Sequence, residues 1–167
     1  MSWPAKFALL VLVCFFSGCG YHVSRQAPIV LPEGVTKVFL DRVVDPTTKP
    51  WLEPRLRTLL RDEFTRRGQV RWVPRDQAQA LLRVEIIRFS DGSMIFDSEE
   101  RTIKSEARLT LKGRIFRRAD QSLLWSSGTI TTRQSYVTGD ASARLEAGTR
   151  AVELAVEQLA DALAMGF

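Results

Sequence analysis

Side chains that could act as nucleophiles, general bases or metal ligands are few in this 167-residue chain. It has one histidine, His22, and two cysteines, Cys14 and Cys19. A Ser–His or Cys–His catalytic pair and a histidine-rich metal site are therefore not expected. The carboxylate pairs Asp62–Glu63 and Glu99–Glu100 have nothing to arrange them and are interpreted as solvated surface pairs. Because a glycine-rich phosphate loop is also missing, the sequence predicts a protein without catalytic activity, metal or cofactor.

Cys19 lies at the end of a stretch with the layout of a secretory signal peptide. Lys6 and the amino terminus supply a short positive region, and Phe7–Phe16 is an unbroken apolar run. A helix that crosses a bilayer needs about 20 apolar residues, so this run is too short to span one. The small residues Ser17 and Gly18 then lead directly into the cysteine. The stretch therefore predicts export.

The four residues Phe16-Ser17-Gly18-Cys19 resemble the lipobox of bacterial lipoproteins, although Phe16 stands where the pattern usually has leucine. The resemblance implies cleavage before Cys19, a diacylglyceryl group on its sulfur and an N-acyl group on its amine, with no other cofactor. Such acyl chains hold a protein stably at a membrane. Gly20, where an aspartate would favour the inner membrane, favours the outer membrane. An ordinary cleaved signal with an incidental cysteine, or a buried helix, remains the alternative.

These features divide the chain into three parts. Residues 1–18 are expected to be the signal peptide, residues 19–34 a lipidated tether, and residues 35–167 a single periplasmic domain. Cys14 leaves with the signal and Cys19 carries lipid, so the mature domain can form no disulfide. The domain must therefore depend on its hydrophobic core.

Hydrophobic periodicity predicts an α+β domain: two helices packed on one face of a mainly antiparallel four-stranded sheet. With one further short strand, whose assignment stays open, the order is β-α-β-β-β-β-α. The expected elements are a strand at 35–44, a helix at 51–67, a short strand at 69–73, strands at 81–89, 102–116 and 123–137, and a helix at 141–165. The other face of the sheet is left for solvent or a partner.

Several details follow from the same patterns. Strict alternation after Ile86 places Ile87 and Phe89 away from the helices, and Ser90–Ser93 has the composition of a turn. In the last strand, alternation places Ile130 and Tyr136 on one face and Trp125 on the other face. Gly128 is expected at a bulge. For the first helix we expect an end at Gly68 and arginines on the outer face, Arg67 included. For the second we expect an N-cap at Asp140 and a buried stripe that contains Leu145, Gly148, Val152, Ala155, Leu159 and Leu163.

Basic residues are concentrated near the strand at 102–116. Residues 101–118 hold seven basic residues against Glu106, a net charge of +6, whereas residues 139–167 carry −3. A charged row on a strand is most often a solvated face that discourages edge pairing. It can also attract phosphates or the acidic lining of a partner. The candidate contact residues are Lys104, Arg108, Lys112, Arg114 and Arg133.

The mature start Cys19-Gly20-Tyr21-His22 is similar to that of the LptE family of outer-membrane lipopolysaccharide-assembly lipoproteins. The segment Leu31–Val35 and the order of the later elements extend the resemblance over the mature chain. The resemblance implies a domain that plugs the β-barrel of an LptD-like translocon and helps to assemble it. It also implies assistance in delivering lipopolysaccharide to the outer leaflet, and direct lipopolysaccharide binding. The expected location is the periplasmic side of the outer membrane, through the lipid anchor.

A second hypothesis is a lipoprotein adaptor or pilot for another envelope assembly, with no lipid ligand. Co-purification with a large β-barrel would separate the two hypotheses. Nucleic-acid binding, suggested by the formal charge of +5 and the arginine-rich first helix, is set aside, because an exported and lipid-anchored chain rarely meets nucleic acid.

Overall fold

The computed structural model describes residues 28–68, 70–96 and 102–165. Cys19 and the predicted signal peptide lie outside these residues. Within them the predicted order of helices and strands is confirmed. The elements are η2 (Pro32–Gly34), β1 (Lys37–Val44), α2 (Leu52–Arg66), β2 (Arg71–Trp72), η3 (Arg75–Gln77), β3 (Ala80–Phe96), β4 (Thr102–Arg117), β5 (Leu123–Tyr136) and α3 (Ala141–Ala164).

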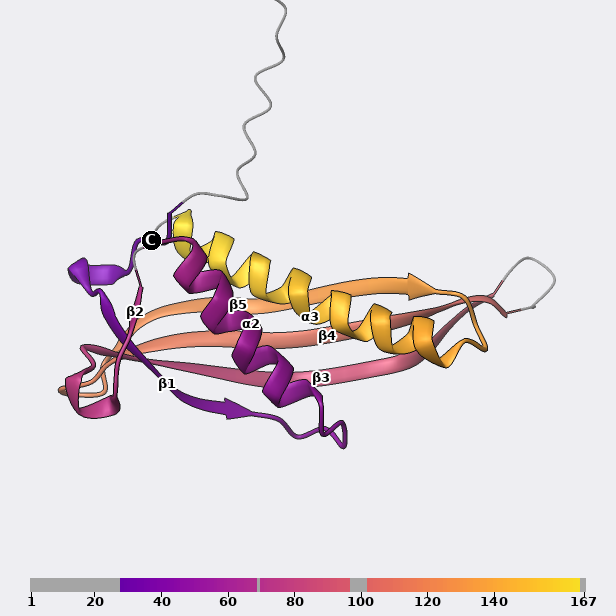
Figure 1. Cartoon of the computed structure of the whole chain (residues 1–167), viewed down its shortest axis with the longest axis horizontal. Coiled ribbons are helices and arrows are strands. Elements are labelled where there is room, and N and C mark those ends of the chain that lie inside the picture. The colour runs from indigo at the N-terminus through magenta and orange to yellow at the C-terminus, as the bar shows by residue number, and fades with distance from the viewer. Residues whose placement is uncertain (1–27, 69, 97–101, 166–167) are drawn as a thin grey trace, which may run out of the picture.

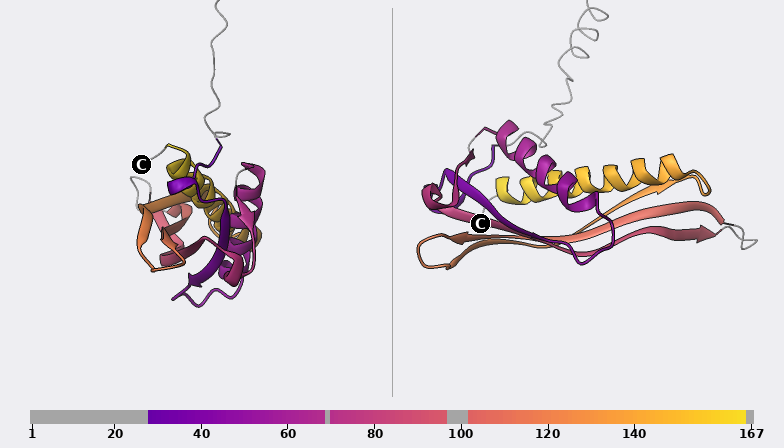
Figure 2. Two further views of the ribbon diagram at one scale, coloured as in Figure 1. Left: turned by 90° about the vertical axis from the view of Figure 1, so that its left-hand side faces the viewer. Right: turned by 60° about the horizontal axis from the view of Figure 1, so that its bottom comes forward.

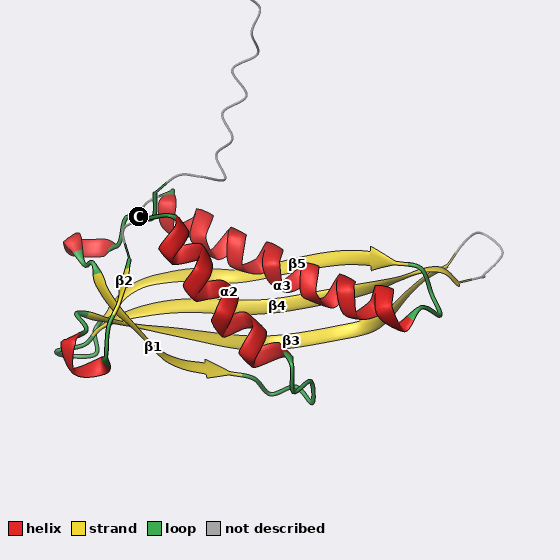
Figure 3. Cartoon of the chain, in the orientation of Figure 1, coloured by secondary structure: helices red, strands yellow, loops and turns green. Residues whose placement is uncertain are grey.

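The strands form one mixed sheet in the order β2-β1-β3-β4-β5 (Figures 1 and 3). β1 pairs in parallel with both β2 and β3, whereas β3, β4 and β5 form an antiparallel meander. The α+β class is confirmed, and the short strand β2 brings the predicted four strands to five. β1, which has apolar residues on both its faces, lies inside the sheet between β2 and β3.

Both helices pack on the same face of the sheet, and Figure 2 shows this two-layer arrangement. The apolar stripe of α2 is buried, with Leu52, Leu56, Leu60 and Phe64 at most 1% exposed. α3 lies close to β4, because Gly113 has no side chain where Leu159 packs. Ile29 and Leu31, which precede the predicted domain boundary at residue 35, also belong to the core.

The predicted helix ends are confirmed by their local geometry. The Asp140 carboxylate accepts hydrogen bonds from the backbone N–H groups of Ser142 and Ala143, which satisfies two donors at the start of α3. The Ser142 hydroxyl also donates to this carboxylate, and together with the two backbone hydrogen bonds it favours the charged form and holds the pKa of Asp140 below its usual value. Gly68 follows α2 with φ +88°, a conformation that glycine adopts without a side-chain clash.

Two predictions about β3 are wrong, and β-bulges are the reason. Between Ile86 and Arg88 the strand advances two residues while β4 advances one, so Ile87 is an extra residue. The alternation therefore changes phase after Ile86. Phe89 turns toward the helices, where its ring meets the ring of Trp51 edge-on at 5.5 Å. The predicted turn at Ser90–Ser93 is a second bulge, and β3 continues through it.

The predicted bulge at Gly128 is confirmed, but its consequence for Trp125 was not foreseen. Trp125 pairs with Ile115 and Ile130 pairs with Leu111, so β5 uses one residue more than β4 over this span. The extra residue lies at the bulge, where Gly128 has φ +67°. Trp125 consequently lies in the core with Ile130, each 8% exposed. Its predicted outward orientation is wrong.

Two helical side chains also depart from the prediction. Leu145 is 55% exposed, because it lines an open groove with Trp51 and Pro54 at the start of α2. Arg67 is 6% exposed, because it reaches between the two helices. In the described part of the chain, no helix is long and apolar enough to cross a membrane.

Candidate functional site

The face of the sheet opposite the helices carries the predicted basic residues. Along β4, Ala107, Leu109, Leu111 and Ile115 are fully buried beneath the helices. The side chains of Arg108, Thr110, Lys112 and Arg114, which alternate with this buried row, point to the open face. No helix in the described residues covers this face, and Figure 2 shows it free along its length. The alternation predicted for β4 is therefore confirmed.

The strand register places all five candidate contact residues on this open face. Lys104, Arg108, Lys112 and Arg114 occupy alternate positions of β4, and Arg133 of β5 lies directly opposite Arg108. The predicted lipidation site Cys19 lies outside the described residues. The structure thus brings the candidates of two strands together, although their environments differ.

At one end of the open face, basic side chains are neutralised by carboxylates of the same domain. The Arg83 guanidinium lies 2.8 Å from the Asp41 carboxylate and stacks on the ring of Phe116, with 4.5 Å to the ring centroid. Arg114 forms an ion pair with Glu85 of β3. We call this group, Asp41, Arg83, Glu85, Arg114 and Phe116, the paired end. Its cations are already engaged, which lowers their capacity to bind an external anion.

Farther along the strands lies a group that we call the open basic patch: Arg88, Arg108, Lys112 and Arg133. It surrounds Thr110 and Thr131, whose hydroxyl oxygens lie 3.2 Å apart. Arg108 lies 2.8 Å from the Glu106 carboxylate. Among the described residues, Lys112, Arg88 and Arg133 have no ion-pair partner. The patch extends about 13 Å along the strands and about 10 Å across them, as the usual strand geometry gives.

Arg88 is the member of this patch that sequence reasoning missed. Strict alternation from Ile86 would turn its side chain toward the helices. The bulge at Ile87 moves it to the open face instead, directly opposite Thr110. The adjacent apolar pair Ile86–Ile87 is a sequence signal for such a change of phase. A second missed residue, Arg83, follows from simple alternation with Leu82 and Val84.

The open basic patch has side chains that can bind anions. Guanidinium groups hold phosphate and carboxylate oxygens through paired N–H donors, and lysine adds a point charge. The hydroxyls of Thr110 and Thr131 can accept or donate hydrogen bonds beside them. Within the described ranges, no group of three His, Cys, Asp or Glu side chains could hold a metal ion. The chemistry that these cations and hydroxyls offer is electrostatic recognition of anions.

Comparisons with known proteins identify the family. Two of the solved structures that match show the same fold. The hypothetical protein CT253 of Chlamydia trachomatis superposes with a TM-score of 0.54 at 11% identity, over 79% of this chain and 99% of that one. Protein XCC0632 of Xanthomonas campestris gives a TM-score of 0.53 at 16% identity, over 80% of this chain and 84% of that one. None of the curated proteins matches in sequence.

The sequence also matches a family model that covers most of the domain. The model is LptE, described as lipopolysaccharide-assembly, and it matches residues 35–164. These residues include the whole sheet from β1 to β5, both helices and every member of the open basic patch. The chain therefore belongs to the LptE family of lipopolysaccharide-assembly proteins.

Proposed function

We propose that this chain is a lipid-anchored, non-enzymatic component of an outer-membrane lipopolysaccharide translocon. In this role it plugs an LptD-like β-barrel, helps to assemble that barrel, and binds lipopolysaccharide through the open face of its sheet. Membership of the LptE family supports the assignment to lipopolysaccharide assembly. The open basic patch is the observation that carries the proposed contact with lipopolysaccharide.

The shape of the domain supports the proposed plug. The domain extends along its strands, and the view along them in Figure 2 shows a much narrower cross-section. The longest strand, β3, has 17 residues and so extends for about 55 Å. Barrels of about 22 strands enclose a lumen wide enough for a folded plug. A narrow and elongated domain is suited to such a lumen.

The electrostatics of the open face support binding of a phosphorylated lipid. Lipopolysaccharide carries phosphates on its lipid A sugars, and clustered cations attract such groups. Arg88, Lys112 and Arg133 have no carboxylate partner among the described residues, so binding a phosphate would break no ion pair of theirs. Arg83 and Arg114 would first have to leave Asp41 and Glu85. The phosphate contact is therefore assigned to the open basic patch.

Co-purification tests the partner. The full-length chain, expressed with an affinity tag in its own outer membrane, is expected to bring down a large β-barrel. A barrel unrelated to lipopolysaccharide transport, or an envelope assembly without a barrel, would instead support the adaptor hypothesis.

Labelling with radioactive palmitate tests the proposed anchor. The full-length chain should take up label, and the Cys19→Ser variant should not. Equal labelling of the two proteins would contradict acylation at Cys19. An unlabelled wild-type chain would contradict the lipid anchor itself.

A further inference from the structure

The free edge of β5 is the longest exposed strand edge in the described part of the sheet. β5 has 14 residues and pairs only with β4, whereas β2 at the opposite edge has two residues. An open edge presents unpaired backbone N–H and C=O groups, which can template pairing with another chain. Proteins usually protect such edges with prolines, charges or bulges. β5 has its bulge near Gly128, and from Thr129 to Tyr136 it continues with one charged residue and no proline.

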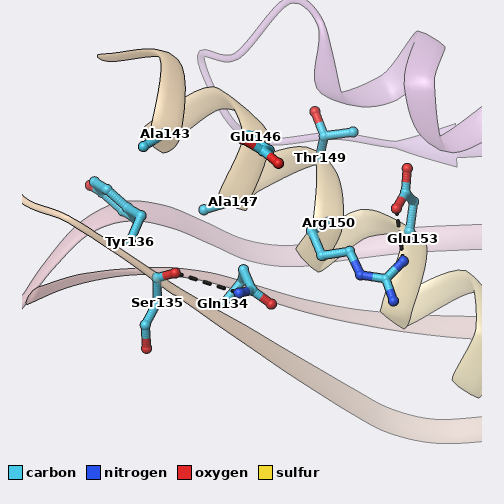
Figure 4. A pocket seen from close by; sticks show the side chains of 9 residues that line it. All are labelled: Gln134, Ser135, Tyr136, Ala143, Glu146, Ala147, Thr149, Arg150 and Glu153. Carbon is cyan, nitrogen blue, oxygen red and sulfur yellow. Dashed lines mark hydrogen bonds and ion pairs between the residues drawn. The ribbon is translucent and has the colours of Figure 1, made fainter. Parts of the chain in front are cut away.

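A groove lies beside the end of this edge, between β5 and the first turns of α3 (Figure 4). Its volume is about 420 Å³, and Gln134–Tyr136 line it on the strand side. On the helix side Ala143 and Ala147 have small side chains, which leaves room next to the strand, and Glu146, Thr149, Arg150 and Glu153 line the rest of the groove. A strand added to β5 would direct alternate side chains into this groove.

One backbone group at this edge already has a substitute partner. The Ser135 carbonyl accepts a long hydrogen bond, 3.4 Å, from the side-chain amide of Gln134. A neighbouring strand would supply a backbone N–H in this place. The flexible side chain can move away when such a donor arrives.

The charges at the edge define the chemistry of the added strand. Arg133 lies directly opposite Arg108, and like charges placed in this way disfavour each other. Glu106 pairs with Arg108 at 2.8 Å, but no carboxylate of the described residues pairs with Arg133. A residue on an added strand would lie beside Arg133 on its free side. An aspartate or glutamate there would supply the counter-charge that β4 does not, and in the complex Arg88 and Lys112 would remain unpaired for the phosphate.

We propose that the edge of β5 from Thr129 to Tyr136 takes up an extended segment of the barrel partner as a sixth strand. The segment has an acidic side chain next to Arg133 and small side chains that enter the groove beside Ala143 and Ala147. Assigning the segment to the barrel rests on the proposed function. Since every strand of a closed barrel already pairs on both sides, the segment is a loop or periplasmic stretch rather than part of the wall.

Hydrogen–deuterium exchange of the full-length chain, free and in complex with the co-purified barrel, tests the pairing. Alternate amides of Thr129–Tyr136 are expected to exchange about tenfold or more slowly in the complex, because each gains a hydrogen bond that must open before exchange. An intact complex with unchanged β5 exchange would overturn the inference and leave the proposed function standing. Failure to form any complex would overturn both. Protection that rises with the concentration of the chain alone would identify a second copy as the occupant, and would also overturn the inference.

A matched pair of variants separates strand pairing from general attraction to a basic face. Arg133→Glu and Arg42→Glu each reverse one exposed charge on the open face, the first on β5 and the second on β1. Arg133→Glu should weaken the complex by about fivefold or more, as loss of a steering ion pair and gain of a like charge predict. Arg42→Glu should leave the affinity within about twofold, as expected of a charge outside the contact. Equal weakening by the two variants would overturn the inference.

Discussion

The two faces of the sheet carry opposite chemistry on the same strands. On β4, Leu109, Leu111 and Ile115 are fully buried under the helices, while Arg108 and Lys112 of the same strand lie on the open face. Because successive side chains point to opposite faces, about half of the side chains of each strand lie in the hydrophobic core and half at the surface. Substitutions under the helices should change stability without changing binding. Substitutions on the open face should do the reverse.

Arginine has different roles between the helices and on the open face of the sheet. Arg67, at the end of α2, is 6% exposed, and its guanidinium lies 2.8 Å from the Glu63 carboxylate and 2.7 Å from that of Asp161. These ion pairs join α2 to the last turns of α3. On the open face, Arg133 has no such partner among the described residues. A cation with two carboxylates holds the fold together, whereas a cation with none is available to a ligand.

The largest effect on stability is expected from Arg67→Met. The change removes the cation and leaves Glu63 and Asp161 without their shared partner. The free energy of unfolding, measured in urea, should fall by about 3 kcal/mol, as expected when one member of a buried ion pair is lost. Arg66→Met is the control, because Arg66 also pairs with Glu63 but is largely exposed. An equal loss in both variants would contradict the structural role of Arg67.

Gly113→Ala should have a smaller effect on the same face. A Cβ at this position would lie 2.5 Å from Cδ1 of Leu159, so the leucine or the helix must move. Overpacking of this kind costs about 1–2 kcal/mol of unfolding free energy. Gly92→Ala is the matched control on β3, because its Cβ would meet nothing within 4 Å. Comparable losses would show that α3 does not lie as close to β4 as the structure indicates.

Protonation of Glu63 at low pH is expected to have a still smaller effect on the free energy of unfolding. Burial acts to raise the pKa of this carboxyl, but the hydrogen bonds and charges of Arg66 and Arg67 outweigh it and leave the pKa below the ordinary 4.5. Because the pKa is depressed in the folded state, the stabilisation is present above pH 4.5 and is lost as pH falls through the folded-state pKa. The difference in unfolding free energy between wild type and Glu63→Gln should therefore shrink below pH 4.5. A difference that stays constant there would contradict the assignment.

The sequence predicted those features that depend on neighbouring residues. The alternation of β4, the Asp140 cap and the Gly68 stop are each encoded within a few positions, and all three are present. The single uncovered face also followed, because two amphipathic helices can cover only one side of such a sheet. These local signals were enough to place the five candidate residues on one face.

The features that the sequence did not predict depend on pairing between distant segments. Whether Ile87 is an extra residue is decided by the register of β3 against β4, and the same holds for Gly128 and β5. Arg88 and Trp125 changed face for this reason. The Ser90–Ser93 segment has the composition of a turn whether or not the strand continues. Arg67 finds Asp161 only when the ends of the two helices meet.

The smallest effect on stability and the largest on binding should come from the double variant Lys112→Glu/Arg133→Glu. Surface changes of this kind alter the unfolding free energy by less than about 0.5 kcal/mol. Lys37→Glu/Arg42→Glu on β1 is the matched control, because it makes the same change in charge at two exposed positions outside the open basic patch.

The affinity of these two variants for purified lipopolysaccharide is the most direct test of the open basic patch. We predict that the Lys112/Arg133 variant binds about tenfold or more weakly than wild type, as expected when phosphate-binding cations are reversed. The Lys37/Arg42 variant should bind as wild type does. Wild-type affinity in a folded Lys112/Arg133 variant would contradict the account. It would show that the open basic patch is an ordinary solvated strand face.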